Sequence, residues 1–328
     1  MEKLNFNEFC EKVREGVESQ LPEKMKVELT EVKKNNGVIL TGMSIGEKAG
    51  RIAANLYLNG AYEDYRNGKI GIDEIVDRAT DMAFDATHHV PFKKEDVDKA
   101  LTHDGAHGHI VGQLIGVEEN KEFLKEVPHE MVNDELALIF REKISNDASL
   151  IIRNEHLSSI QMDLEELKAE ARNNEMTEYK FADIVDWMPA MRNMPGGMMF
   201  IGGNVNMDNG GISNFGASCV TDPFFMEEVR EVLGEDCGVG NYVILPSSVH
   251  ECIFIPYNEN LEVSALSELI REVNFSTVAR EEQLGSKPFM YDYDTGKVIT
   301  MEEGLEKISR AHEHDNSHDL VIPDIDIA

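Results

Sequence analysis

The sequence lacks any long apolar run. No stretch approaches the roughly 18 consecutive apolar residues that a membrane-spanning helix needs. The N-terminal residues MEKLNFNEFCEKVREGV also lack an apolar core between a basic start and a small-residue cleavage site, so they are typical of a first helix and not of a signal peptide. We therefore expect a soluble protein that does not enter the membrane and works in the cytoplasm.

Cysteines are few and widely spaced. The four residues Cys10, Cys219, Cys237 and Cys252 form no CxxC pair, and three of them lie in segments predicted as helix or buried strand. This pattern favours reduced, structural thiols. It argues against disulfides and against a zinc site made of cysteines.

Basic residues are outnumbered two to one. With 31 Lys and Arg against 62 Asp and Glu, the net charge is −31, which repels nucleic-acid phosphates and anionic membrane surfaces. Direct nucleic-acid binding is therefore disfavoured. An acidic DNA mimic is one alternative, but the acids are spread along the chain and not gathered in blocks, which favours an ordinary solvated surface.

Nucleotide and hydrolase motifs are also missing. The sequence contains no GxxxxGK[ST], no dinucleotide GxGxxG and no GxSxG elbow. The glycines of GEDCGVGNY are followed by no predicted helix, so they do not indicate a phosphate-binding loop. No cofactor is expected.

The chain length of 328 residues suggests two domains. In residues 1–90, helical spacing predicts a helix over 5–21, and Asn36-Gly37 is a strong hairpin signal between alternating strands. RIAANLYLNG predicts a further strand, and one or two helices follow it. The polar segment HHVPFKKEDVD with its proline places a boundary near residue 90.

Residues 91–309 alternate between predicted strands and helices. GHIVGQLIG, ELALIFREKI and ASLIIRN are typical of strands, while Asp163 with Glu166 and Asp222 with Pro223 predict helix starts. Leu266, Leu269, Ile270 and Val273 mark another helix. We expect an α+β fold in which a small N-terminal helix-plus-hairpin unit packs on this larger mixed αβ domain, with residues 310–328 as an acidic, mobile tail.

Two polar clusters follow predicted strands. The segment NEH supplies Glu155 and His156, and YVILPSSVHECIFIP supplies Ser248, His250 and Glu251. If the two strand ends are adjacent, the imidazoles and carboxylates could converge as a catalytic acid, base or metal site. Side chains two residues apart, such as Ser248 and His250, rarely align for proton transfer. The favoured interpretation is that these groups satisfy backbone hydrogen bonds where a strand bends.

A histidine group in HDGAHGHI is a second candidate. His103, His107 and His109 lie close in sequence with Asp104, and histidine is a common metal ligand. The spacing lacks the HExxH pattern and the glycines indicate a flexible loop. A solvated polar loop is therefore the favoured interpretation over a metal site.

Six segments in order carry a family resemblance. They are VKKNNGVILTGMSI, NLYLNGAYEDYRNG, ENKEFLKEVPHEMVND, LIIRNEHLSSIQMDLEELKAEA, LPSSVHECIFIP and IREVNFSTVAREEQLGSKPFMYDYDT. Together, over residues 3 to 295, they resemble the domain-of-unknown-function family 5688. The resemblance implies a bacterial cytoplasmic protein of Firmicutes, often encoded on mobile elements, with one integrated architecture and no established activity.

These observations favour a non-enzymatic accessory or regulatory protein that binds a protein or a small ligand. The reason is that a chain of this length shows no recognisable catalytic constellation. Two alternatives stay open: a hydrolase or metal-assisted enzyme using the His and Glu cluster, and the acidic DNA mimic.

Overall fold

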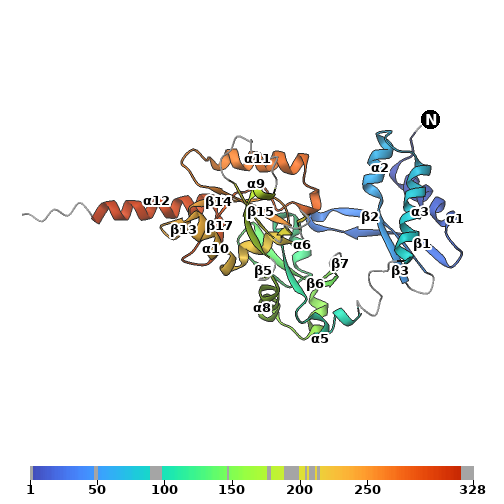
Figure 1. Cartoon of the computed structure of the whole chain (residues 1–328), viewed down its shortest axis with the longest axis horizontal. Helices are drawn as coiled ribbons and strands as arrows, with labels where there is room; N and C mark the ends of the chain where they lie inside the picture. Colours follow the sequence, from blue (N-terminus) through green and yellow to red (C-terminus); the bar gives the residue numbers. More distant parts are fainter. Residues whose placement is uncertain are drawn as a thin grey trace, which may run out of the picture. The chain divides into compact units, whose positions relative to one another are not determined.

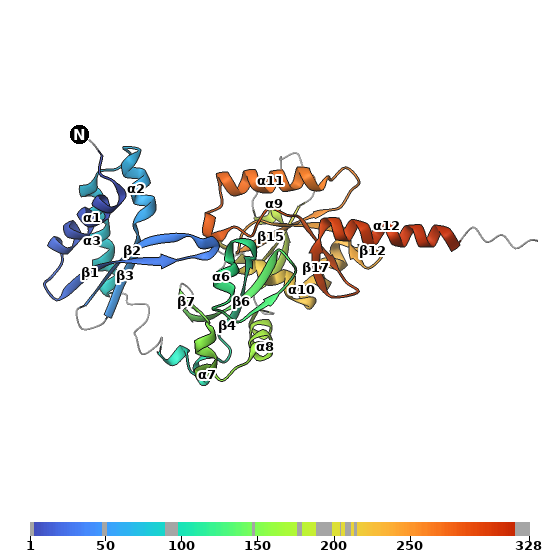
Figure 2. The same ribbon diagram turned by 180° about the vertical axis from the view of Figure 1, so that it is seen from behind.

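The computed structural model describes residues 3–47, 51–88, 98–145, 148–175, 179–187, 199–203, 205–206, 211–212 and 215–318. The chain forms two compact units, Met1–Ala106 with Lys143–Leu150 and His107–Glu142 with Ile151–Ala328. Both combine helices and strands (Figures 1 and 2), so the expected α+β class is confirmed. The boundary expected near residue 90 lies outside the described residues.

The first unit packs helices against a three-stranded antiparallel sheet of order β1-β2-β3. Its elements are α1 (Phe6–Gln20), β1 (Met25–Lys33), β2 (Ile39–Glu47), β3 (Arg51–Tyr57), α2 (Leu58–Arg66), α3 (Ile72–His88) and the short α5 (His103–Ala106). Helix α1 begins with a capping box between Asn5 and Glu8, which satisfies two backbone N–H groups. Its apolar face, which includes Phe9 and Val13, is fully buried in the core.

The hairpin predicted from Asn36-Gly37 joins β1 to β2. Both residues have positive φ, 58° for Asn36 and 64° for Gly37, which is the conformation that Asn and Gly tolerate best. The strands pair from Lys33 with Ile39 to Met25 with Glu47. The turn prediction is confirmed because the sequence places residues suited to positive φ where the chain reverses.

Two further antiparallel sheets have most of their strands in the second unit, while residues 143–150 of one sheet belong to the first unit. One has the order β4-β6-β5, with β7 also paired with β6, and the other has the order β12-β13-β16-β14-β15-β9-β8, with β17 paired with β16. The strands are β4 (Ile110–Gly116), β5 (His129–Met131), β6 (Leu136–Ser145), β7 (Ala148–Ile151), β8 (Lys180–Asp183), β9 (Phe200–Gly203), β12 (Glu235–Asp236), β13 (Val239–Gly240), β14 (Tyr242–Pro246), β15 (Glu251–Pro256), β16 (Phe289–Asp292) and β17 (Lys297–Thr300). A further pair joins β10 (Val205–Asn206) to β11 (Gly211–Ile212).

Helices cover both faces of the larger sheet. The longer helices are α10 (Pro223–Leu233), α11 (Val263–Ser276), α12 (Met301–His318) and α8 (Leu164–Glu175), of which α8 packs on β4 of the smaller sheet. Shorter helices of the unit are α6 (Lys121–Leu124), α7 (Leu157–Ile160) and α9 (Ile184–Trp187), with 3₁₀ turns η2 (Glu118–Asn120), η3 (Asn154–His156), η5 (Gly216–Thr221) and η6 (Arg280–Glu282). On one face, α11 and α12 pack on Val243 and Leu245 of β14. On the other face, Phe225 of α10 packs against Phe254 of β15, and η5 contacts the same strand. Strand β14 is therefore buried along its whole length.

The predicted helix starts are confirmed. Asp163 and Glu166 exchange side-chain and backbone hydrogen bonds at the start of α8. The Asp222 carboxylate accepts from two backbone N–H groups at the start of α10, with Pro223 in the first turn. Helix α12 continues to His318, so the first part of the segment expected to be a tail is helical, and residues 319–328 lie outside the described residues.

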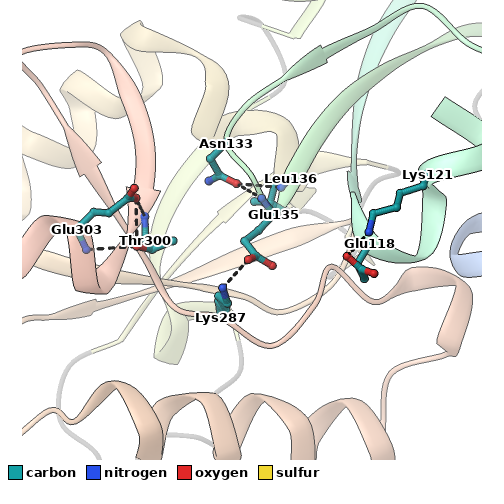
Figure 3. Close-up of polar contacts among 8 residues, drawn as sticks. All are labelled: Glu118, Lys121, Asn133, Glu135, Leu136, Lys287, Thr300 and Glu303. Carbon is teal, nitrogen blue, oxygen red and sulfur yellow. Dashed lines mark hydrogen bonds and ion pairs between the residues drawn. The ribbon is translucent and has the colours of Figure 1, made fainter. Parts of the chain in front are cut away.

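Polar contacts connect the two sheets within the second unit (Figure 3). In the β5–β6 turn, the side chain of Asn133 accepts from the backbone N–H groups of Glu135 and Leu136. It also donates to the Val298 carbonyl in β17. The Glu135 carboxylate forms an ion pair with Lys287, which precedes β16. These contacts hold the β5–β6 turn against the strands β16 and β17.

Within the described ranges, none of the helices combines the length and the apolar content that crossing a membrane requires.

Candidate functional site

The predicted Ser248, His250 and Glu251 cluster lies where β14 connects to β15, with Glu251 as the first residue of β15. These strands pair from Tyr242 with Pro256 to Pro246 with Cys252, so the cluster follows the last residue pair of the hairpin. The Ser248 hydroxyl donates to Glu251 Oε2 at 2.9 Å and accepts from the His250 backbone N–H at 3.0 Å. Ser248 and Glu251 are buried, at 5% and 9% exposure. The hydroxyl is thus directed to a carboxylate and to backbone, and not to the imidazole.

The imidazole of His250 faces a different set of groups. Its Nδ1 accepts from the Phe215 backbone N–H at 3.2 Å, and its Nε2 lies 3.4 Å from Glu282 Oε1. A ring nitrogen that accepts from an N–H carries no proton in the neutral ring, so the neutral tautomer has its proton on Nε2 and donates it to Glu282. His250 therefore connects the start of η5 to η6.

Glu155 and His156 form a closely similar arrangement in η3. His156 Nδ1 accepts from the Arg153 backbone N–H at 3.1 Å, and Nε2 lies 3.7 Å from Glu155 Oε1. Asn154 donates to the Lys125 carbonyl, which fixes the turn to the end of α6. The imidazole serves as a cap for this short helical turn.

The structure brings together Ser248 with Glu251, and Glu155 with His156. None of the hydrogen bonds or ion pairs made by these described side chains joins the first cluster to the second. Each imidazole has one nitrogen committed to a backbone N–H. An acid–base pair built from His156 and His250 is not assembled by direct contact.

All three histidines of HDGAHGHI are exposed, and two of them lie beside carboxylates. His103 Nδ1 lies 3.3 Å from the exposed carboxylate of Asp104, at the start of α5. His107 Nδ1 lies 2.8 Å from Glu170 Oε1 on α8, and the Gly108 N–H donates to the other oxygen of the same carboxylate. The Glu170 carboxylate therefore ties this loop to α8.

A buried carboxyl group that the sequence did not single out lies on β6. Glu142 is 2% exposed and its Oε2 has no hydrogen-bond partner in the described part of the chain. Burial raises the pKa of Glu142 from 4.5 to about 8, because the charged form loses its hydration. The neighbouring Arg141 lies with its guanidinium 4.7 Å from the Phe215 ring, and burial lowers its pKa to about 10. Only the alternation of β6 could have indicated that Glu142 points inward.

A surface pocket of about 580 Å³ lies beside α11 and η6 of the second unit. It is lined by Glu119, Arg271, Asn274, Phe275, Val278, Arg280, Gln283, Gly285 and Ser286. Asn274 donates to the Gly285 carbonyl and Gln283 donates to the Asn274 carbonyl, so its wall is held by hydrogen bonds. The sequence did not predict this pocket, since its residues come from the end of one helix and the loop after it.

Two arginines and one aromatic residue give the pocket its chemical character. Arg271 and Phe275 lie four residues apart, hence on one side of α11, whereas Leu266, Ile270 and Asn274 form its buried side. Phe275 is 94% exposed. Arg271 makes no ion pair with any described residue. The pocket therefore offers a guanidinium and an aromatic ring to a ligand at the same place.

Comparison with known proteins gives a family. The model of a family of unknown function, DUF5688, matches residues 6–293. No curated protein and no solved structure matches the chain. The matched range covers nearly all of the six segments that carry the resemblance in the sequence, and it includes α11 and η6. The chain therefore belongs to the DUF5688 family of unknown function.

Proposed function

We propose that this protein is a non-enzymatic accessory or regulatory protein that binds a partner protein through the pocket at α11 and η6. The observation that carries the proposal is Phe275, 94% exposed beside a pocket that contains Arg271 and Arg280. Exposed aromatic and arginine side chains are enriched among the residues that dominate binding energy at protein interfaces. The cytoplasmic location and the association with a mobile element, expected from the sequence, belong to this proposal.

The charge of the chain supports a specific kind of partner. A net charge of −31 attracts basic proteins at long range and repels acidic ones. Within that negative field, the Arg271 guanidinium of the pocket favours a local carboxylate, which arginine can bind through two parallel hydrogen bonds. The partner we propose is therefore basic overall and inserts a short segment with one acidic and one apolar side chain.

The pocket is open and its lining mixes polar and apolar side chains, which favours a protein segment over a buried small molecule. Small-molecule sites are usually enclosed and lined by apolar side chains. Here arginine, asparagine, glutamine and glutamate side chains contribute much of the lining, and Phe275 projects into solvent beside them. An inserted segment would cover Phe275 and pair with Arg271 at once.

The test uses the full chain with a photoreactive amino acid in place of Phe275, expressed in its host and crosslinked. A crosslinked partner is then purified, and its affinity is measured for wild type, Phe275→Ala and Arg271→Ala. Loss of a central aromatic contact should weaken binding by about 30-fold, which corresponds to about 2 kcal/mol. Phe224→Ala is the matched control, because Phe224 is also an exposed phenylalanine, at 68%, but on α10.

Equal affinity of the Phe275→Ala and Phe224→Ala variants would contradict the proposal. Hydrolysis of a test substrate that disappears in His250→Asn would instead favour the hydrolase. Binding of a DNA-binding protein that depends on surface acids, and not on Arg271, would favour the DNA mimic. Each result concerns a different set of residues, so the three functions can be distinguished.

A further inference from the structure

A group of potential metal ligands lies at the turn between β12 and β13. Asp236, Cys237 and His312 each offer one ligand atom, and these three atoms all lie within 4.8 Å of one another. Among the residues that the structure describes, no other group of three or more His, Cys, Asp or Glu side chains has this spacing. We infer that these three residues form a binding site for a zinc-like divalent cation that fastens α12 to the β12–β13 turn.

The distances are suited to tetrahedral coordination. Zinc bonds of about 2.0 to 2.3 Å to oxygen, nitrogen and sulfur place neighbouring ligand atoms roughly 3.3 to 3.6 Å apart. His312 Nε2 and Asp236 Oδ1 are 3.2 Å apart, close to this separation. The Cys237 sulfur lies within 4.8 Å of both, on an exposed side chain.

The backbone of the turn is a second observation that points to Cys237. The pairs Glu235 with Gly240 and Asp236 with Val239 leave a two-residue loop, in which Cys237 has φ 50° and Gly238 has φ 77°. Such loops favour Asn, Asp or Gly at the first position, because other residues are strained at positive φ. Cysteine has no conformational advantage there. A strained residue with a reactive side chain is a reason to look for a function of that side chain.

The ligand types select the metal. Thiolate and imidazole suit zinc and similar transition metals, whereas calcium and magnesium prefer oxygen ligands alone. Asp236 and the Cys237 thiolate would together supply two negative charges to the cation. The Asp294 carboxylate also lies against the turn, since a Cβ atom on Gly238 would approach its Oδ2 to 2.5 Å. Three protein ligands leave one coordination position for water.

The site would join segments that are far apart in the sequence. Asp236 and Cys237 lie within the residues 6–293 matched by the family, and His312 lies beyond them in α12. Lys307 already ties α12 to this region, with Nζ 2.6 Å from Asp292 Oδ2. α12 projects from the side of the second unit where Figure 1 labels β13 and β17 and Figure 2 labels β12 and β17. A metal bound at His312 would hold the helix to the turn one to two turns beyond Lys307.

The test is metal binding by the purified full chain after chelator treatment. We expect one equivalent of Zn²⁺, release of protons on binding because the thiol must ionise, and a thiolate-to-metal charge-transfer band when Co²⁺ replaces Zn²⁺. Cys237→Ser and His312→Asn should each weaken Zn²⁺ binding by about tenfold or more, and Cys237→Ser should also abolish the band. All three ligands are at least partly exposed, so the metal-free variants should unfold at the wild-type temperature.

His107→Asn is the matched control, because His107 is an exposed histidine that also lies beside a carboxylate. Its Zn²⁺ affinity should equal that of the wild type. The inference is overturned if Co²⁺ gives no thiolate band, or if Zn²⁺ binds Cys237→Ser and His312→Asn as tightly as the wild type. These readouts do not involve the pocket at α11, so they are independent of the proposed function.

Discussion

Two connections in the eight-stranded sheet contain similar side chains and differ in what those side chains contact. The β14–β15 connection has Ser248, His250 and Glu251, whose hydroxyl and imidazole bind backbone N–H groups. At the β12–β13 turn, the ligand atoms of Asp236, Cys237 and His312 gather around one another. The comparison teaches that residue type alone does not identify a site. Polar groups that satisfy the backbone support the fold, whereas heteroatoms that converge on one point can hold a ligand.

Glu142 on β6 belongs to neither kind. Its carboxyl group is buried, and its Oε2 has no hydrogen-bond partner among the described residues. A buried carboxyl without a partner is most stable in its neutral form, which is why its pKa is raised to about 8. Glu142 therefore shows how a buried polar side chain behaves when it neither binds the backbone nor lies among other potential ligands.

The largest effect is expected for Glu142→Gln, measured as the free energy of unfolding against pH. The folded-state pKa of about 8 lies above the unfolded value of 4.5, so the folded wild type retains a proton that the unfolded chain loses. Its contribution to stability is full below about pH 4.5 and is lost as the pH rises to about 8. The neutral glutamine removes this loss. At about 1.4 kcal/mol per pKa unit, the variant should gain about 3 to 5 kcal/mol relative to wild type between pH 5 and pH 9.

Urea unfolding at several pH values measures this difference. Glu122→Gln is the control, because the Glu122 side chain is 86% exposed and forms only a surface ion pair with Lys125. Parallel stability curves for the wild type and Glu142→Gln over this pH range would show that Glu142 is ionised in the folded protein. Glu142 would then not differ in kind from the side chains at the β14–β15 and β12–β13 connections, and the comparison would not hold.

Ser248→Ala should have the next largest effect. The substitution leaves the His250 N–H and the largely buried Glu251 carboxylate without the hydroxyl that binds both. Leaving buried polar groups unsatisfied costs about 1 to 3 kcal/mol in unfolding free energy, and we expect about 2 kcal/mol here. Ser247→Ala is a matched control one residue away, and it should change stability by less than about 0.5 kcal/mol. Equal effects of the two substitutions would remove the structural role from Ser248.

Much of the fold could be predicted because its signals are local. The turn at Asn36-Gly37, the capping residues of α8 and the Asp222-Pro223 start of α10 each depend on residues within one turn of each other. Burial was harder to predict. Residues 252–255 form a continuous apolar run, yet β15 alternates between buried and partly exposed residues there, whereas β4, β9, β14 and β16 are buried along their whole length.

The candidate sites were less predictable because they depend on contacts between distant segments. Strand β16 pairs with both β13 and β14, and nothing local to residues 289–292 specifies those partners. His312 meets Asp236 across 76 residues, and it does so only because α12 continues beyond residue 310. The spacing of Cys237 from the other cysteines excluded a site made of cysteines, but it contained no information on a mixed site with one cysteine.

The smallest effect of a substitution is expected for Cys237→Asn in the absence of metal, and it tests the comparison most directly. Without metal, Cys237→Asn should stabilise the protein by about 0.5 kcal/mol, because asparagine tolerates the positive φ of 50° better than cysteine does. With Zn²⁺ at 100 times its dissociation constant, the wild type should gain about 2.7 kcal/mol, and the variant should gain much less. The order of stability would therefore reverse when Zn²⁺ is added. Thermal unfolding of both proteins with chelator and with Zn²⁺ measures this, and an unchanged order would mean that Cys237 fills a turn position and binds no metal.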